Sequence, residues 1–565
     1  MITLRAVRRW AIDHGVPRSR FLSAYRSSLE LSIARLAQAI YRERLCPARL
    51  VDDRSLGTCL VLGQPSLIVV PIVPKCFVRL DVRVWPSCYR PDREPICWSG
   101  PCLREFSRLL ENSAVSDRYE ELADDFQNSL SNLVLNRLLG PRATTSRRAL
   151  EPAYQGHHYY PFPGLRVGPS VDQVIACSHL NTRIVAVGLL EVSTLSFKST
   201  VFSRLSDCFV AWTGTRRGSE KLAIPVHPWQ LKISPVVAAL VSAGGARLLS
   251  QRIRCMPLAS QRTLRVQATG YDVKLSVHAA LTSEHRLLFR LNCENAPTVS
   301  ALVRRLVHAE GPREFDIQED VASLSFGDVR LAPHLSAIVR APIRLRGQEV
   351  AVPAIELWTG REVAMDFLRN ANHGSVCRFF RNYCRTLLKG PAQFLLRFGL
   401  AFEPHLQNAI VVFQGGTPRK LILRDLDGTV MDRRYVAGLL AAHDLQLARD
   451  TWDHMPSPDV GEDRLVHSLF FGHIGVVIDF LTAKCGADEA ELLEILAEEW
   501  RHLPQVLGLR GTAERRFDQL CEHLANGKKM LVARLERSQQ MKFIRLPRHS
   551  AFPQGPLTTQ IPKRP

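Results

Sequence analysis

The chain has 565 residues, of which 46% are hydrophobic and 23% are charged, and its formal net charge is +20. This hydrophobic content excludes an intrinsically disordered chain, and the length predicts roughly three or four domains. The basic residues are spread along the sequence without a run of five, a distribution that favours small polyanions over nucleic acid as partners.

Targeting signals and cysteine usage indicate the cellular compartment of the protein. The first residues, MITLRAVRRW, lack the unbroken apolar stretch of a signal peptide, and the most apolar run, residues 66–74, is short and broken by Pro71. The fourteen cysteines form no C-x-x-C pair and no set with zinc-ligand spacing. These features predict a cytoplasmic protein without a membrane span, whose cysteines are mostly small buried hydrophobic residues.

Residues 1–150 are predicted to be mostly helical, with strands inserted. Within them, residues 103–140 place apolar side chains at steps of three and four, which is typical of an amphipathic helix. Gly140 and Pro141 are the expected stop signal of this helix.

The pattern changes after residue 150. Residues 151–353 contain short β-branched runs separated by turn residues, and Thr269-Gly270 is predicted to form a hairpin turn. Residues 354–545 return to helical patterns, with Pro391 expected as the first residue of a helix. Residues 546–565 are rich in proline and are predicted to be a disordered tail. The whole is predicted to be an α+β fold.

A β-hairpin is predicted over residues 408–425, because two apolar runs flank a turn segment that contains two glycines and a proline. If Phe413 lies opposite Lys420, then Asn408 lies opposite Asp425, and their side chains share one face of the sheet. An amide oxygen beside a carboxylate suits Mg²⁺ bridging phosphates, as in protein kinases.

The alternative is that Asp425 and Asp427 only cap a turn before Gly428, and a register slip of one residue would separate the predicted pair.

A second group of polar residues lies between 260 and 286. Hydroxyl, guanidinium and ammonium groups follow one another across the predicted hairpin, and such groups bind phosphate and carboxylate oxygens well. The members are Ser260, Arg262, Thr263, Lys274, Thr282 and Arg286. The alternative is an ordinary solvated sheet face with charged residues protecting an edge.

Six stretches in order resemble the NRPS-independent siderophore synthetases, the aerobactin-synthetase-like (IucA/IucC) family. The stretches are GHHYYPFPGLRVG (156–168), IPVHPWQ (224–230), SQRT (260–263), KLSVHAALTSEHR (274–286), EPHLQN (403–408) and RDLDG (424–428). The resemblance implies a three-part cupped hand: a helical thumb (1–150), β-rich fingers (151–353) and a helical palm (354–545) with a small ATP-binding sheet.

It also implies a cytoplasmic, homodimeric, ATP- and Mg²⁺-dependent ligase. Such an enzyme adenylates citrate or a related polycarboxylic acid and then joins it to an amine or alcohol, releasing AMP and pyrophosphate.

The resemblance assigns roles residue by residue. The nucleotide-binding positions are Ser260, Arg262, Thr263, Lys274, His405, Gln407, Asn408 and Asp425, and the last two are also the magnesium ligands. The positions associated with the carboxylate substrate are His157, Thr282, Arg286 and Glu403. Lys274, Arg286 and His405 are the expected catalytic residues.

Two departures concern the first motif, where the family has a histidine at the position of Tyr160 and a lysine at the position of Gly164. They put ordinary citrate in doubt as the substrate. His227 is equally compatible with catalysis and with shaping a turn. Two other functions stay open: a kinase-like phosphotransferase that uses Asn408 and Asp425 as a metal clamp, and a non-catalytic protein that binds anions or nucleic acid.

Overall fold

The computed structural model describes most of the chain, and all structural statements below concern this part. The described residues are 2–53, 57–63, 67–75, 79–82, 87–90, 93–97, 119–140, 159–180, 184–193, 220–281, 284–359, 361–370, 375–524, 526–528, 530 and 543–545. The predicted tail, 546–565, lies outside them.

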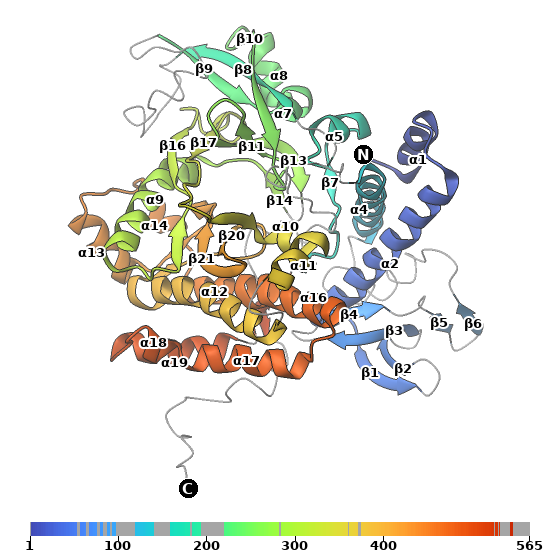
Figure 1. The fold of residues 1–565 in the computed structure, drawn as a ribbon. Helices are drawn as coiled ribbons and strands as arrows, with labels where there is room; N and C mark the ends of the chain where they lie inside the picture. Colours follow the sequence, from blue (N-terminus) through green and yellow to red (C-terminus); the bar gives the residue numbers. More distant parts are fainter. Residues whose placement is uncertain are drawn as a thin grey trace.

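The described residues of the N-terminal part form three helices and an antiparallel sheet (Figure 1). The helices are α1 (Leu4–Asp13), α2 (Arg18–Arg42) and α4 (Tyr119–Leu139), and α4 packs against both of the others. Gly140 ends α4 with a φ of +62°, as its sequence signal predicts. Residues 103–118 of the predicted helix lie outside the described part. The strands are β1 (Ala48–Asp53), β2 (Gly57–Leu62), β3 (Leu67–Lys75), β4 (Arg79–Val82), β5 (Ser87–Arg90) and β6 (Arg93–Cys97).

A seven-stranded antiparallel sheet forms the centre of the next part, in the order β16-β17-β12-β11-β10-β8-β9. Its strands are β8 (Val185–Ser193), β9 (Lys221–Val226), β10 (Arg247–Pro257), β11 (Thr263–Val266), β12 (Asp272–Leu275), β16 (Asp320–Leu324) and β17 (Ala337–Arg340). Alternating apolar residues of these strands form their own buried cluster.

Smaller elements flank this sheet. A three-stranded sheet, β14-β13-β7, contains β7 (Arg166–Val167), β13 (Val277–Leu281) and β14 (Glu284–Arg286). The helices are α5 (Val171–Cys177), α7 (Pro228–Ile233), α8 (Pro235–Ser242) and α9 (Arg290–Glu310), and a 3₁₀ turn covers Ala332–His334.

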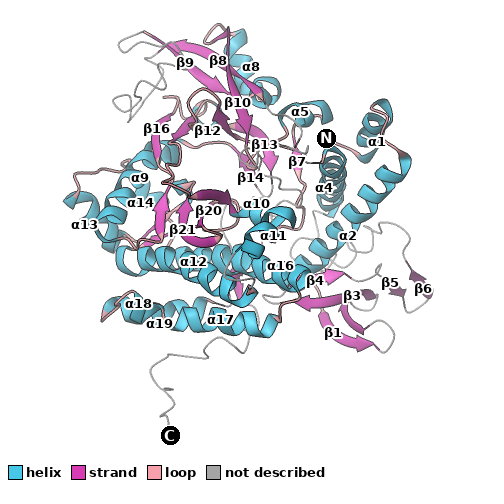
Figure 2. Ribbon diagram, viewed as in Figure 1, coloured by secondary structure: helices cyan, strands magenta, loops and turns pink. Residues whose placement is uncertain are grey.

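A four-stranded sheet, β15-β21-β20-β18, lies against helix α12 (Val376–Phe398; Figure 2). The hairpin β20 (Ala409–Gln414) and β21 (Thr417–Leu423) supplies its two central strands. The outer strands are β15 (Phe315–Ile317), which is parallel to β21, and β18 (Val350–Pro353). The two outer strands therefore come from a more N-terminal segment than the hairpin that they flank.

Helix α12 (Val376–Phe398) runs through the position at which a new helix is predicted to begin. Ser375 caps its start by accepting a hydrogen bond from the Arg378 amide at 3.3 Å, and Gly399 ends it with a φ of +67°. Pro391 lies inside this helix, so the prediction that it begins a new helix is wrong.

The remaining C-terminal elements are mostly helical. They are α10 (Ala354–Thr359), α11 (Arg361–Asn370), β19 (Leu400–Ala401), β22 (Val430–Met431), α13 (Arg433–Ala442), α14 (Thr451–His454), α15 (Pro458–Val466), the π-helix η7 (His467–Ile474), α16 (Gly475–Cys485), α17 (Glu489–Arg501), α18 (Leu503–Val506), α19 (Thr512–His523), β23 (Asn526–Lys528) and β24 (Phe543–Arg545).

The helical stretch Pro458–Cys485 has the length and composition of a membrane span, but 89% of its most apolar window is buried inside the protein, as in a core helix of a soluble protein. The predicted mixed helix-and-sheet fold is confirmed.

Candidate active site

The hairpin β11–β12 sets Lys274 directly opposite Thr263. Its turn contains Gly270 at a φ of +75°, a conformation that glycine adopts without steric cost. The predicted hairpin is therefore confirmed. Lys274 is only 2% exposed, so the alternative of a solvated sheet face is wrong for this residue.

The hairpin β20–β21 is also confirmed, but its predicted register is wrong by one residue. Gly415 and Gly416 both have positive φ and form a two-residue turn, and a bulge follows Val412, which pairs with Lys420. Beyond the last pair, the Arg424 amide donates to the Asn408 carbonyl at 3.0 Å. Asn408 therefore faces Arg424, and the prediction that it lies opposite Asp425 does not hold.

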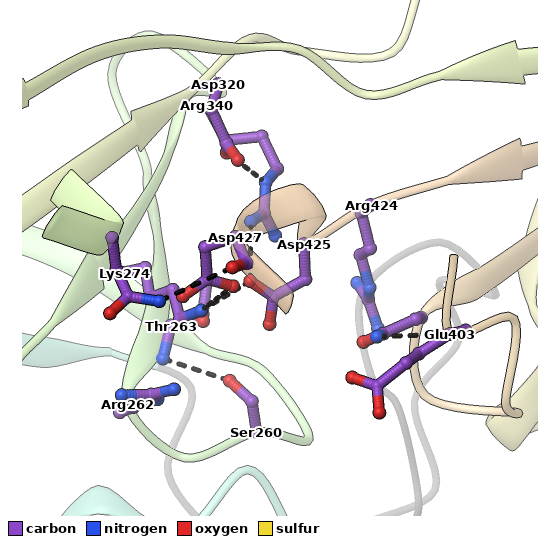
Figure 3. A network of polar contacts seen from close by, with 12 residues as sticks. Ser260, Arg262, Thr263, Lys274, Asp320, Arg340, Glu403, Arg424, Asp425 and Asp427 are labelled. Atoms are coloured by element: carbon purple, nitrogen blue, oxygen red, sulfur yellow. Dashed lines mark hydrogen bonds and ion pairs between the residues drawn. The ribbon is translucent and has the colours of Figure 1, made fainter. Parts of the chain in front are cut away.

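Lys274 joins the two hairpins (Figure 3). Its ammonium group donates to a carboxylate oxygen of Asp425 and, at 2.9 Å, to one of Asp427. Asp425 precedes the 3₁₀ turn Leu426–Gly428, has a φ of +69°, and makes no capping hydrogen bond to that turn. The two aspartates thus bind a distant lysine, and the alternative that they only cap a turn is wrong.

Two residues that the sequence analysis did not single out complete this network. Arg340, at the end of β17, donates to Asp425 at 3.2 Å and to Asp320 on the adjacent strand at 2.8 Å. Both Arg340 and Asp320 are buried. The only signal in the sequence is a charged residue within each of two apolar strands, and strand order is needed to bring them together.

The charges of this network give the carboxyl groups of Asp425 and Asp427 different pKa values. Burial disfavours ionisation of Asp425, but Lys274 and Arg340 outweigh this effect and hold its pKa well below the usual range. Burial also raises the pKa of Asp427, and the negative charge of Asp425 adds to the increase, so that its pKa is about 6 despite Lys274. Asp425 is therefore ionised at neutral pH, while Asp427 titrates just below it.

The 260–263 loop lies beside this network (Figure 3). Gln261 has a φ of +64°, and the Ser260 hydroxyl accepts a hydrogen bond from the Thr263 amide at 3.0 Å, which closes the loop. The Arg262 guanidinium donates to the Arg286 carbonyl at 3.1 Å. Arg286 in turn donates from Nε to the Leu281 carbonyl at 3.0 Å. The loop therefore fixes Arg262 and Arg286 relative to each other.

Segment 403–408 turns back on itself before β20. The Asn408 amide donates to Nδ1 of His405 at 3.3 Å, and the Asn408 side chain donates to the Glu403 carbonyl at 3.3 Å. The Glu403 carboxylate lies 3.6 Å from Arg464, which also donates to the Gly428 carbonyl at 2.5 Å.

Through its contacts with Glu403 and Gly428, Arg464 links segment 403–408 to the end of segment 425–428. The carbonyl of Gln407 accepts a hydrogen bond from Arg424 Nε at 2.9 Å, and Figure 3 shows Arg424 beside Glu403.

The structure describes residues 159–168 of the first motif, GHHYYPFPGLRVG, but not His157. Thr282, which belongs to the 274–286 stretch, also lies outside the described residues. Gly164 packs against α4, where a Cβ atom would clash with the Ser129 carbonyl and lie 2.9 Å from Leu133 Cγ. A lysine cannot be accommodated there without moving α4.

His227 is fully buried and caps α7, accepting a hydrogen bond from the Trp229 amide at 3.1 Å. Burial lowers the pKa of His227 to about 3. Its geometry supports the turn-shaping interpretation.

The carboxylates of Asp425 and Asp427 fit a magnesium ion in chemistry. Both oxygens converge on one ammonium, and hard oxygen ligands are those that Mg²⁺ prefers. Within the described ranges, no group of three or more His, Cys, Asp or Glu side chains is arranged to hold a metal ion by itself. Magnesium at this site would therefore need phosphate oxygens and water as further ligands.

Comparison with known proteins shows what this chain and its fold are similar to. Residues 147–358 match the model of the IucA / IucC family. The fold is similar to that of the petrobactin biosynthesis protein AsbB from Bacillus anthracis, with a TM-score of 0.76 and 15% identity over 94% of this chain and 97% of that one. It is also similar to ATP-bound aerobactin synthetase IucA from Klebsiella pneumoniae, with a TM-score of 0.72 and 15% identity over 91% and 99%.

A curated relative, staphyloferrin A synthase of Staphylococcus aureus, is 23% identical over 50% of this chain and 49% of its own length. The resemblance to the siderophore synthetases is therefore confirmed. The chain spans between 48% and 62% of the length of the curated relatives that it matches.

Residues 377–543 match a second model, described as ferric iron reductase FhuF-like transporter. The described cysteines of this segment do not form a metal-binding group.

Proposed function

We propose that the chain is an ATP-dependent siderophore synthetase. It would adenylate one carboxylate of citrate or a related polycarboxylic acid, and then condense the acyl-adenylate with an amine or alcohol. The observation that carries this proposal is the contact of Lys274 with Asp425 and Asp427, because it joins the two polar segments that the resemblance assigns to the nucleotide.

The donors around this contact suit a polyphosphate. Ser260, Arg262 and Lys274 supply a hydroxyl, a guanidinium and an ammonium group from one hairpin. His405 accepts the Asn408 amide at Nδ1, so its ring proton sits on Nε2, and we propose that this N–H donates to a phosphate oxygen when the nucleotide binds. Charge-assisted hydrogen bonds of this kind contribute about 1.5–3 kcal/mol each.

The proposed reaction has two displacements. A substrate carboxylate oxygen attacks the α-phosphorus of ATP, the bond to the β-phosphate oxygen breaks, and pyrophosphate leaves. The amine or alcohol then attacks the acyl carbon, loses its proton and displaces AMP. Lys274 and Arg262 would stabilise the charge that develops on the phosphate oxygens, since both are fixed before the substrate arrives.

Magnesium would be held by Asp425 and Asp427 and would neutralise phosphate charge when bound. Asn408 is predicted as a ligand on the basis of a position opposite Asp425, and its place opposite Arg424 removes that support. Lys274 partly neutralises the same carboxylates. With nucleotide and metal bound, Lys274 would contact phosphate oxygens and the two carboxylates would hold the metal.

The carboxylate substrate is proposed to lie near Arg286, with His157, Thr282 and Glu403 as further contacts. Gly164 leaves this chain without the lysine of the family motif, and its packing against Ser129 keeps the position closed to a larger side chain. This supports an acid that carries less negative charge than free citrate.

The test is a screen for pyrophosphate release. Purified protein is given ATP and Mg²⁺ with citrate, 2-oxoglutarate or succinate, and each acid is paired with diamines, amino acids and amino alcohols. AMP and pyrophosphate are the expected products, and ADP would support the phosphotransferase instead. Salt-sensitive binding of DNA or RNA without ATP turnover would support the non-catalytic alternative.

Two variants test the site itself. Arg262→Ala and His405→Ala are each expected to abolish pyrophosphate release with little change in thermal unfolding. Arg330→Ala is the matched control, because the Arg330 side chain is 86% exposed and pairs with Asp328. Full activity of both site variants would refute the assignment.

Compartment and assembly follow as parts of the same proposal. Seven of the described cysteines are free thiols, which fits a reducing cytoplasm; they are Cys46, Cys177, Cys255, Cys293, Cys377, Cys384 and Cys485. We propose a cytoplasmic homodimer that acts on small molecules.

A further inference from the structure

A chain of buried hydrogen bonds lies behind segment 403–408. Trp358 Nε1 donates to the Tyr383 hydroxyl at 2.7 Å, the hydroxyl lies 2.7 Å from Nε2 of His473, and Nδ1 of His473 lies 2.8 Å from the Pro404 carbonyl oxygen. All three side chains are at most 3% exposed. The chain therefore connects helices α10 and α12 through η7 to the residue that precedes His405.

The direction of these hydrogen bonds is fixed by their ends. The Pro404 carbonyl can only accept, so Nδ1 of His473 carries the proton. The Trp358 indole can only donate, so the Tyr383 oxygen accepts from it and gives its own hydrogen to Nε2. Burial lowers the pKa of His473 to about 4. The imidazole is thus neutral and held in a single tautomer near neutral pH.

The π-helix contacts segment 403–408 at a second point. The Gly472 carbonyl accepts a hydrogen bond from the Leu406 amide at 3.4 Å, and a Cβ atom at Gly472 would lie 3.3 Å from His405 Cβ. From the other side, the Ile355 amide donates to the Leu406 carbonyl at 3.0 Å. The residues on both sides of His405 are therefore fixed by hydrogen bonds, and π-helical turns of this kind are frequent at functional sites.

We propose that His473 is a positioning residue for His405: through its Nδ1–H it holds the Pro404 carbonyl and so sets the backbone from which the His405 ring reaches the nucleotide phosphates. This inference rests on the proposed function for the identity of the ligand. The positioning itself concerns only the protein.

Two variants separate the two hydrogen bonds of His473. In His473→Asn the side-chain amide can replace Nδ1 as the donor to Pro404, while the contact with Tyr383 is lost. In His473→Gln the longer side chain reaches towards Tyr383 instead. Both remove the ring and part of its volume, so a purely structural role predicts equal effects. Tyr383→Phe is a third variant, which removes the hydroxyl that donates to Nε2 of His473 and leaves the contact with Pro404 in place.

The measurements are amide hydrogen exchange of a peptide covering residues 403–409 in the full chain, binding of MgATP by calorimetry, and the KM values for ATP and for the acid. We expect His473→Gln to raise exchange and the KM for ATP about tenfold, the loss of one buried hydrogen bond, with the KM for the acid unchanged. His473→Asn should stay within about threefold of the unmodified protein, and Tyr383→Phe should fall between the two.

Equal exchange rates in the Asn and Gln variants, or equal affinities for MgATP, would overturn the positioning role. If the unmodified protein releases no pyrophosphate with any pair of substrates, the proposed function fails. The exchange comparison then still decides the role of His473, because it needs no substrate.

Discussion

Replacing Lys274 with methionine removes the charge that joins the two hairpins while nearly keeping the side-chain volume. Lys274 is 2% exposed, and its partners Asp425 and Asp427 are 25% and 14% exposed. Without the ammonium group the two carboxylates face each other, and Arg340, at 3.2 Å from Asp425, is the remaining cation in direct contact. Removing one partner of a buried ion pair typically costs about 3–5 kcal/mol of folding free energy.

The pKa of Asp427 makes this cost depend on pH. The pKa of Asp427 is about 6 in the folded protein, whereas the ordinary value for aspartate is 3.8. Between pH 3.8 and pH 6 the folded protein therefore binds more protons than the unfolded protein does. The contribution of Asp427 to stability is therefore present at acidic pH and lost as the pH rises through about 6. At pH 7.5 the Lys274→Met variant must tolerate a second buried charge or protonate Asp427, which costs about 2 kcal/mol. At pH 5 Asp427 is already protonated and this cost disappears.

The assay is urea unfolding at pH 5 and pH 7.5. We expect the deficit of Lys274→Met to be about 2 kcal/mol larger at pH 7.5. Adding Asp427→Asn should remove this difference, since the amide has no charge to lose. Lys221→Met is the control, because Lys221 is 68% exposed and its pair with Glu191 should contribute at most about 1 kcal/mol. A deficit that is the same at both pH values, and that Asp427→Asn does not reduce, would refute the reasoning.

Two further predictions concern local packing and capping. Gly164→Ala should lower the thermal unfolding midpoint by overpacking against Ser129, at a cost of about 1–3 kcal/mol or more. Gly438→Ala in α13 is the control, and it should raise the midpoint slightly because the space around Gly438 is open. Equal midpoints for the two variants would contradict the packing argument. Asp432→Ala should cost about 1 kcal/mol in denaturant unfolding, because Asp432 caps α13 by accepting from the Arg434 amide at 3.1 Å, and Asp432→Asn should restore most of it.

The hairpins show how far local sequence signals reach. Gly270 and the pair Gly415-Gly416 predict their turns correctly, because each of these glycines adopts a positive φ that other residues avoid. The register of β20–β21 was not predictable, because the two-residue turn and the bulge after Val412 shift the pairing by one residue. Sequence patterns do not show which residue a bulge will leave unpaired.

Helix α12 shows where local signals mislead. Gly390 and Pro391 would ordinarily end a helix. Here a Cβ atom at position 390 would overlap the ring of Phe315, so the glycine serves close packing rather than a turn. Tertiary contact overrides the breaker signal, and only the three-dimensional structure reveals that contact.

The candidate site also contains residues that the sequence pointed to and residues that only the structure revealed. The residue types at Lys274 and Asp425 point to anion and metal chemistry, and the structure brings these two residues into contact. Arg340 and His473 gave no such signal, because one depends on the order of strands in a sheet and the other on a hydrogen bond to a carbonyl group far away in sequence.

The wide helical turn at His467–Ile474 has a consequence for changes in chain length. A π-helical turn holds more residues than an α-helical turn, so the loss of one residue would let the backbone continue as an ordinary α-helix. Each residue of a π-helical turn advances the chain around the helix axis by less than the roughly 100° of an α-helical residue, so the turn itself absorbs the extra residue. After the deletion the side chains from Gly475 to Cys485 would keep nearly the same rotational phase, and Val477 and Ile478 would still face the core. The damage would instead fall on the deleted turn, where Gly472 accepts a hydrogen bond from the Leu406 amide.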